Sequence, residues 1–367
     1  MNRNYISQHR KEMAHMKQIN KLDFSGQDIY VGIDTGKKSW KVTILTKEYE
    51  HKTFNQNPNP EELVTYLHKN FPNANYLCAY EAGYFGFWIC HLLNQMGVKC
   101  IVVHPADIPT KDKEKHNRND SSDARKIART LRSGELTPLY VPSLSEQQAR
   151  SLVRMRLEMK RKETRCKNQI KAMLTFYGVN IPDEMANSHW AKRFILWLEN
   201  LDSDNQALSA LLMELSGLRE ILVKLTKQIR SLANQEPYIR PVKNLCSVPG
   251  ISTLTAMVLL TELSDISRFS NSDHLASYVG LSPGEDSSGD KEKTTGLSRR
   301  RNGYLRSVLI ESSWVAVRKD PALLMSFTEL TKRMSKNEAI IRIAHKLLNR
   351  IRHVLMHNEC YELGIVS

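Results

Sequence analysis

The sequence predicts a protein of mixed α/β and α class, which begins as an α/β layer structure and continues as helices. Over residues 27–140, short runs that alternate between apolar and polar residues are interspersed with segments of helical spacing, a pattern typical of strands and helices packed in layers. After Pro142, long segments carry apolar residues at helical spacings instead. We therefore expect four parts, which are a basic extension 1–26, an α/β domain 27–140, a helical region 141–240 and a mostly helical domain 241–367.

The α/β domain is predicted to start with a β-hairpin. Ile29, Val31 and Ile33 alternate with residues of the opposite face, and the alternation resumes over residues 40–45 after a short connection that contains glycine. The same criteria predict the elements that follow, namely a helix over 61–68, a strand over 76–81, a helix around 86–96, a strand over 98–103 and a helix over about 121–131.

The region after Pro142 is predicted to be helical. Residues 145–177 contain neither glycine nor proline, and residues 203–234 carry leucine and isoleucine at helical spacings. These two tracts can pair as an antiparallel helical hairpin within one chain, or as a coiled coil between subunits. Further helices are expected around 304–318 and 337–356, after a loop rich in glycine and serine over residues 280–303.

The turn Val248-Pro249-Gly250-Ile251 separates two helical segments of the last domain. A turn of this kind resembles a helix-hairpin-helix element, in which backbone N–H groups at the start of a helix bind a DNA phosphate. The same turn also occurs in helical bundles that bind no nucleic acid. Both interpretations stay open at this point.

Charge and composition narrow the class of function. Lysine and arginine outnumber aspartate and glutamate by 53 to 39, and the resulting charge of +14 with a pI near 9.4 favours a polyanionic partner. The 6 cysteines include no CxxC pair, which argues against a structural zinc site or a disulfide framework and fits a reducing cytosol. No apolar run reaches the roughly 20 residues of a membrane span, and the start of the sequence lacks a signal-peptide core. We expect a protein of the bacterial cytoplasm or nucleoid, with no membrane partner.

Acidic residues lie where predicted strands end or a helix begins, at Asp34, Glu81, Asp120 and Asp123. Each has an ordinary structural explanation, since aspartate favours turns and helix caps and a strand can end on an exposed glutamate. As a set, however, acids at two strand ends and an i, i+3 pair on one helical face match the arrangement in RNase H-like and RuvC-like nucleases. In those enzymes the carboxylates hold one or two Mg²⁺ or Mn²⁺ ions.

A second chemical candidate is the pair Ser287-Ser288, which precedes Gly289 in the loop. A Ser-Ser-Gly segment is usually only flexible polar chain, and a serine is a poor nucleophile until it is activated. A carboxylate-bound metal would be the economical activator if the two regions meet in space. Basic residues that can neutralise a phosphate follow the serines, and we predict that they bind nucleic acid: Lys291, Lys293, Arg299, Arg300, Arg301 and Arg306. The same role is predicted for three residues of the first helical tract, Arg154, Lys160 and Arg161.

Several segments resemble the DEDD transposases of insertion sequences related to Piv invertases, a family of bridge-RNA-guided serine recombinases. The similar segments are YVGIDTGKKSWKVTIL, YEAGYFGFWICHLL, NDSSDARKIARTL, the long run from SVPGIS to LRSVL, and IRIAHKLLNRIRHVL. They span almost the whole chain. The resemblance implies that the metal ligands are Asp34, Glu81, Asp120 and Asp123, and that the catalytic serine is Ser288, with Ser287 as the alternative register.

The same resemblance implies a fold and a reaction. The fold would be an RNase H-like (RuvC-like) domain, a coiled coil and a helical transposase domain. The reaction would cut and rejoin donor and target DNA through a phosphoserine intermediate with Mg²⁺ or Mn²⁺, guided by a structured bridge RNA. This sequence departs from the family in Gly36, where histidine or serine is usual, in Asn119, where threonine is more common, and in its longer N-terminal extension. None of these departures removes a predicted ligand.

We therefore predict a site-specific DNA recombinase that works as a homo-oligomer, either a dimer or a tetramer. Because the acids and the serine lie in separate predicted domains, the site would be composite. One alternative is a hydrolytic RuvC-like nuclease or junction resolvase, in which Ser288 is a bystander. Another is a non-enzymatic nucleic-acid-binding regulator. A tyrosine recombinase is disfavoured, since no Arg-His-Arg set accompanies Tyr278 or Tyr304.

Overall fold

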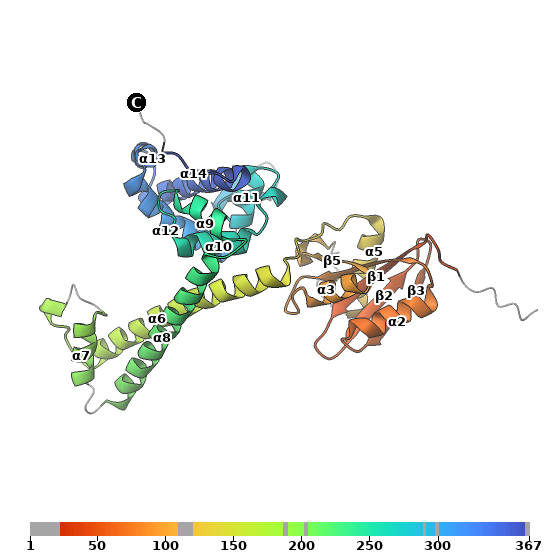
Figure 1. The fold of residues 1–367 in the computed structure, drawn as a ribbon, viewed down its shortest axis with the longest axis horizontal. Helices are drawn as coiled ribbons and strands as arrows, with labels where there is room; N and C mark the ends of the chain where they lie inside the picture. Colours follow the sequence, from red (N-terminus) through yellow and green to blue (C-terminus); the bar gives the residue numbers. More distant parts are fainter. Residues whose placement is uncertain are drawn as a thin grey trace, which may run out of the picture. The chain divides into compact units, whose positions relative to one another are not determined.

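The computed structural model describes residues 23–108, 120–185, 190–201, 205–288, 291–297 and 301–363, with the backbone alone for 120–122, 283–288 and 291–296. The chain divides into two compact units, Met1–Pro142 and Ser143–Ser367 (Figure 1). Each unit has its own layers and its own core, and each is described by itself.

The first unit is built on a five-stranded sheet in the order β3-β2-β1-β4-β5 (Figure 1). Its strands are β1 (Asp28–Thr35), β2 (Trp40–Leu45), β3 (Glu50–Gln56), β4 (Asn75–Glu81) and β5 (Lys99–Val103). β2 pairs antiparallel with β1 and β3, whereas β4 pairs parallel with β1 and β5. This mixed sheet with its helices fits the predicted α/β class, including the β-hairpin of β1 and β2.

Helices cover both faces of the sheet. The helices α2 (Pro60–Asn70) and α3 (Trp88–Gln95) share a core with the alternating apolar residues of β1, such as Ile33. On the opposite face lies α5 (Asp120–Ser133), which contacts β1, β2 and β4. The short 3₁₀ helix η1 (Pro105–Asp107) follows β5.

Gly32 lets α5 lie directly on β1. A Cβ atom at Gly32 would be 2.1 Å from the carbonyl oxygen of Ala124 and 2.5 Å from the amide nitrogen of Ala128. Both atoms belong to the backbone of α5, so no side chain can turn away to make room. The glycine therefore sets how closely the helix approaches the sheet, and it stands two residues before Asp34.

The second unit begins with an antiparallel helical hairpin formed by α6 (Leu144–Phe176) and α8 (Gln206–Ala233), which are joined through η2 (Asp183–Met185) and α7 (Lys192–Asn200) (Figure 1). Arg156 donates to Thr226 at 2.9 Å, whereas Cys166, further along α6, donates to the carbonyl oxygen of Leu211 at 3.3 Å. As the residue numbers rise along α6, those of their partners on α8 fall, so the two helices are antiparallel. Of the two predicted pairings, the structure contains the one within the chain.

The remaining helices form one core, to which the hairpin helices contribute Val153 and Ile229. They are α9 (Ile239–Cys246), α10 (Thr253–Leu263), η4 (Ile266–Arg268), α11 (Ser272–Val279), α12 (Gly303–Lys319), α13 (Pro321–Thr331) and α14 (Lys336–His357). Leu259, Leu309 and Leu347, from three of these helices, are fully buried. In the part of the chain that the structure describes, no helix is long and apolar enough to cross a membrane.

The predicted glycine- and serine-rich loop is wrong over most of its length. Residues Pro283–Ser288 (β6) and Lys291–Leu297 (β7) pair as a two-stranded antiparallel sheet. These strands carry no apolar alternation that would have revealed them, and their pairing satisfies backbone hydrogen bonds instead. The strand β3, at the edge of its sheet, also lacks apolar alternation and was not predicted. The helices α7 and α13 were not predicted either.

The predicted turn at Gly250 does separate two helices, α9 and α10. Gly250 has a φ of 89°, and a Cβ atom there would be 2.4 Å from the carbonyl oxygen of Ser312 in α12. Close packing on α12 therefore explains this glycine without a ligand. Phosphate binding by the turn stays a prediction.

Candidate active site

Two of the predicted metal ligands, Asp34 and Glu81, lie at the ends of neighbouring parallel strands. The last residues paired between β1 and β4 are Ile33 and Tyr80, and the two acids come directly after them. Because parallel neighbours lie about 4.8 Å apart, their carboxyl ends meet at one edge of the sheet. Both acidic residues are half-buried, and both interact with other groups of the chain.

Asp34 and Glu81 also lie on the same face of the sheet. Side chains alternate along a strand, so Asp34 shares the face of Gly32, against which α5 packs. On β4, Ala79 packs with Ile127 of α5, and Glu81 follows two residues later. Both acids therefore occupy the face that α5 covers.

The direction of α5 brings its first turn toward Asp34. At the other end of the helix, Arg132 donates to the carbonyl oxygen of Thr46 at 3.3 Å. Thr46 follows Leu45, which pairs with Tyr30 near the start of β1. Since the last turn of α5 lies near the start of β1, its first turn, with Asp120 and Asp123, lies toward the end of that strand. The structure thus gathers the four predicted positions at one end of one face, although the side chain of Asp120 lies outside the described residues.

The carboxylate set fits a hard divalent cation. Mg²⁺ and Mn²⁺ prefer oxygen ligands, and the predicted donors are all carboxylates. In the structure Asp123 pairs with Lys126 at 3.3 Å. Among the described residues, Asp34, Glu81 and Asp123 do not have donor atoms that all lie within 4.8 Å of one another. A cation bound by Asp123 would compete with Lys126 for the charge of this carboxylate.

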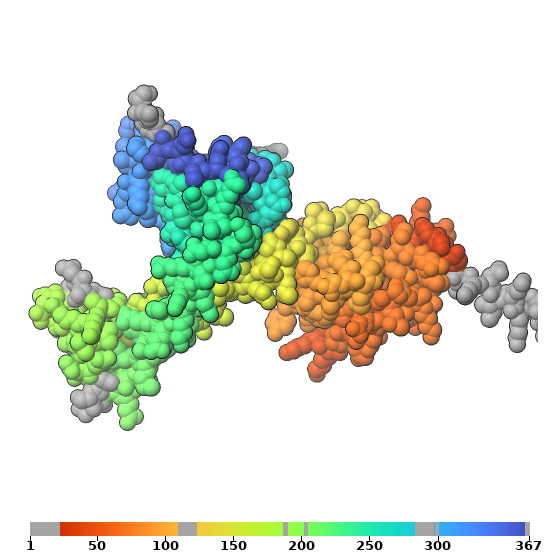
Figure 2. Space-filling model, in the orientation of Figure 1, coloured from red at the N-terminus to blue at the C-terminus, as the bar shows by residue number. Residues whose placement is uncertain are grey.

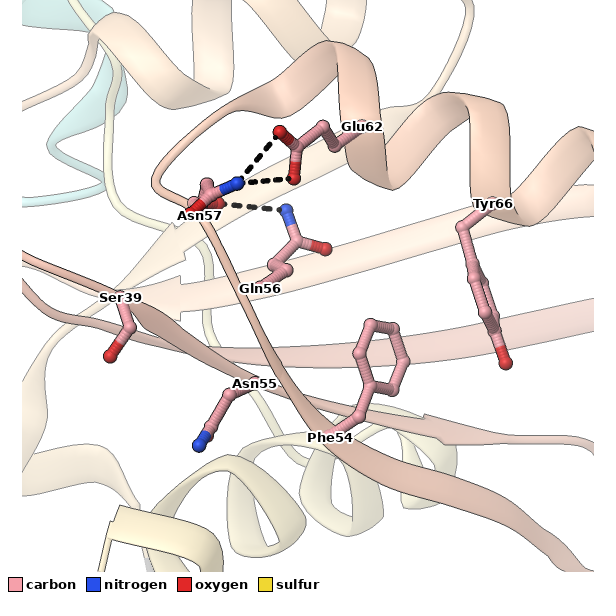
Figure 3. Close-up of a pocket in the computed structure, with 7 residues that line it drawn as sticks. All are labelled: Ser39, Phe54, Asn55, Gln56, Asn57, Glu62 and Tyr66. Carbon is pink, nitrogen blue, oxygen red and sulfur yellow. Dashed lines mark hydrogen bonds between the residues drawn. The ribbon is translucent and has the colours of Figure 1, made fainter.

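A hollow elsewhere on the first unit is not part of this site. Its lining comes from β3, α2 and the turn before β2, and includes Phe54, Gln56 and Tyr66 (Figure 3). The amide nitrogen of Asn57 donates to Glu62 at 3.0 Å there. None of the predicted metal ligands lines the hollow.

The predicted catalytic serine belongs to the second unit. Ser288 is the last residue of β6 and is paired in register with Lys291, the first residue of β7; Ser287 is paired with Glu292. Lys293 also lies on β7. Arg299 and Arg300 lie outside the described residues. The backbone thus places both serines and Lys291 at the same end of one hairpin.

A buried glutamate, which the sequence analysis did not single out, fixes the chain that follows this hairpin. Glu262 is 1% exposed. It accepts hydrogen bonds from Arg154 at 2.6 and 2.8 Å and from the amide nitrogen of Asn302 at 2.7 Å. Asn302 in turn caps α12 by accepting from the backbone N–H groups of Tyr304 and Leu305. The start of α12 is therefore tied to both α10 and α6.

The three basic residues predicted on α6 already have partners within the chain. The bond to Glu262 raises the pKa of the Arg154 guanidinium above its usual value. Lys160 pairs with Glu163 at 2.6 Å, and Arg161 pairs with Glu158 at 2.5 Å. The Tyr304 ring, 5.0 Å from Arg154 and 5.1 Å from Arg161, lies against both guanidinium groups. Contact of these basic residues with nucleic acid stays a prediction.

Two arginines after the hairpin, Arg301 and Arg306, lie close enough for their charges to interact. Burial, and secondarily the charge of Arg301, lower the pKa of Arg306. The side chain of Arg301 is exposed. Because the two guanidinium groups repel each other, an anion between or beside them would relieve that repulsion. This electrostatic effect is consistent with their predicted contact to a phosphate.

Comparison with known proteins points to the same regions. A family model for DEDD transposases of IS110 type matches residues 31–179, and a model for transposases of the IS116/IS110/IS902 family matches residues 242–328. The first contains Asp34, Glu81, Asp120 and Asp123, and the second contains the β6–β7 hairpin.

Individual relatives are transposases by name. The chain is 32% identical over 241 residues to the putative transposase y4qE of Sinorhizobium fredii, an alignment that covers 65% of this chain and 58% of that protein. It is 26% identical over 282 residues to the transposase of insertion sequence element IS1111A of Coxiella burnetii, with 73% and 74% covered. A probable family 20 transposase of Pseudomonas aeruginosa is 23% identical over 348 residues, with 91% and 98% covered.

Proposed function

Because the chain belongs to the IS110-type family of DEDD transposases, we propose that it is a site-specific recombinase that cuts and rejoins DNA. In this proposal Asp34, Glu81, Asp120 and Asp123 hold Mg²⁺ or Mn²⁺, and Ser288 is the nucleophile. The observation that carries the proposal is the convergence of two parallel strand ends and the first turn of α5 on one edge of the sheet. If the acids served only as helix caps and turn residues, they would not need to lie at the same edge of the sheet.

The first unit is suited to hold its acids in a fixed arrangement. Asp34 and Glu81 are placed by paired strands and Asp123 by a helix, and ligands on such elements are held more accurately than ligands on loops. A divalent cation bound there would supply positive charge beside the scissile phosphate. The close approach at Gly32 keeps α5 against β1 and so holds the helix-borne acids near the strand ends.

The proposed chemistry at Ser288 conserves the phosphodiester bond energy. The serine Oγ forms a bond to phosphorus while the bond from phosphorus to one deoxyribose oxygen breaks. The serine proton passes to a base, and the released deoxyribose oxygen takes up a proton. Attack by a DNA hydroxyl on the phosphoserine then reverses these changes and rejoins a strand. No external energy source is needed.

This reaction requires both units to act at one phosphate, whether the units come from one chain or from two subunits. We further propose that a structured bridge RNA selects the donor and target DNA, and that the active form is a homodimer or homotetramer. The charge of +14 and the family membership support a nucleic-acid partner. Sequencing the nucleic acid that copurifies with the protein would test the guide: one discrete RNA is expected, and random fragments would contradict it.

Replacing Asp123 with asparagine is expected to lower DNA cleavage at least about 100-fold, because a neutral amide is a much weaker ligand for a hard cation than a carboxylate. The affinity for Mn²⁺, measured by the electron paramagnetic resonance of the free ion, should fall in parallel. Folding should change little, since the pair with Lys126 that is lost is partly exposed.

Asp28→Asn is the matched control for this change. Asp28 stands at the opposite end of β1, where it accepts a hydrogen bond from the amide of Asn75 at 3.0 Å. The control variant should keep both Mn²⁺ affinity and cleavage. If Asp123→Asn keeps both Mn²⁺ affinity and cleavage, Asp123 is not a metal ligand and its carboxylate serves only the start of the helix. If the wild type itself neither binds Mn²⁺ nor cuts DNA, a nucleic-acid-binding regulator becomes the better account.

A further inference from the structure

Three side chains at the end of α14 lie close enough together to share one ion. His353 and His357 are one helical turn apart, with ring centroids 4.2 Å from each other. Together with Glu359, they offer one ligand atom each, and these atoms all lie within 4.8 Å of one another. α14 reaches the surface of its unit (dark blue in Figure 2), and all three side chains are exposed.

The helix end brings the third side chain into place. Asn358 caps α14 in the left-handed conformation, with a φ of 54° and a ψ of 43°. The chain therefore folds back, and the backbone N–H of Glu359 donates to the carbonyl oxygen of Val354 at 3.3 Å. As a result, a carboxylate oxygen of Glu359 lies 3.1 Å from Nε2 of His353.

A backbone bond orients the ring of His357. Its Nδ1 lies 2.9 Å from the carbonyl oxygen of His353. A carbonyl can only accept, so this contact favours the tautomer in which Nδ1 carries the proton and Nε2 presents a lone pair to an ion. Metal-binding histidines typically have one ring nitrogen fixed in this way while the other binds the ion.

We propose that His353, His357 and Glu359 form a binding site for a divalent transition-metal ion, with Zn²⁺ as the preferred species. Two imidazole nitrogens and one carboxylate oxygen are a donor set that suits Zn²⁺, whereas the carboxylates of the first unit suit Mg²⁺. Three protein ligands leave a fourth position for water or for a donor from another molecule. The proposal does not depend on the recombinase function.

The ion would strengthen an existing attachment of the chain after α14. Asn358 accepts a hydrogen bond from the amide of Asn244 in α9 at 3.0 Å, and the N–H of Tyr361 donates to Ser247 at 2.7 Å. Glu359 lies between these two anchors. A metal link from Glu359 to the histidines would therefore tie this segment to α14 as well as to α9.

Titration of the full-length protein with Zn²⁺ against a chromophoric chelator tests the site, with excess Mg²⁺ present to occupy the carboxylates of the first unit. The wild-type chain is expected to bind one Zn²⁺. The affinity of His353→Gln and of His357→Gln for this ion should each be at least about tenfold lower. Zn²⁺ should also raise the melting temperature of the wild type more than that of either variant.

The control is His345→Gln, which removes a histidine of the same helix that is not in the group of three. It should bind Zn²⁺ like the wild type. Because His353 and His357 are exposed, their variants should fold normally, which circular dichroism would verify. Equal Zn²⁺ affinity in the wild type, His353→Gln and His357→Gln, or no Zn²⁺ binding by the wild type, would overturn the proposal.

Discussion

Replacing Ser288 with alanine is expected to abolish the covalent protein–DNA adduct and to lower strand exchange at least about 1,000-fold, because alanine has no oxygen to attack phosphorus. Binding of DNA and RNA should change by less than about twofold, since the substitution removes no charge that neutralises a phosphate. The adduct is measured as labelled DNA that stays attached to the protein in a denaturing detergent gel.

Ser287→Ala is the matched control, because the two serines are neighbours on β6. It should form the adduct at the wild-type rate. Loss of the adduct in Ser287→Ala and its retention in Ser288→Ala would show that Ser287 is the nucleophile. If Ser288→Ala still cuts DNA at the wild-type rate and neither protein forms an adduct, attack by water explains the cleavage, and the chain is a hydrolytic nuclease.

Replacing Arg154 with alanine is expected to lower the free energy of unfolding of the second unit by about 1–3 kcal/mol, because the buried carboxylate of Glu262 would lose the hydrogen bonds from the partly exposed Arg154. Glu262 is 1% exposed and, among the described residues, its carboxylate would keep only the hydrogen bond from Asn302. Urea unfolding followed by far-UV circular dichroism measures the change. DNA cleavage should also fall, since the start of α12 after the hairpin depends on the same contacts.

Arg161→Ala is the control for this substitution. Arg161 also lies against Tyr304, but its partner Glu158 is 42% exposed, so the loss should be below about 1 kcal/mol. Equal small losses in both variants would contradict the structural role of Arg154. Weaker DNA binding with unchanged stability in Arg154→Ala would instead assign it to the nucleic-acid interface.

The parts of the fold that were predictable are those that depend on local pattern. The alternation of Ile29, Val31 and Ile33 reflects a strand with one face in the core, and these side chains are fully buried. The hairpin of β6 and β7 gave no such signal, because its residues are almost all polar. The ion pair of the buried Glu262 with Arg154 could not be predicted either, since the partners are 108 residues apart in the sequence.

The sequence allowed the acidic residues of the candidate site to be named, but not the contacts that bring them together in space. The acids at Asp34 and Glu81 could be identified from the sequence, yet their proximity depends on parallel pairing of β1 with β4, which are not consecutive strands. The placement of Asp123 depends on the direction of α5 and on its close approach at Gly32. Both are long-range contacts, which local spacing does not encode.

In the proposed reaction, the acids of the first unit and Ser288 act on the same phosphate. Formation of the adduct as a function of divalent metal concentration tests it most directly, with the modified residue located by peptide mass spectrometry. We expect a nucleotide on Ser288 that forms only when Mg²⁺ or Mn²⁺ is present, and that requires at least about tenfold more metal in Asp123→Asn. An adduct on Ser288 that forms equally fast in chelator and in Asp123→Asn would contradict the account.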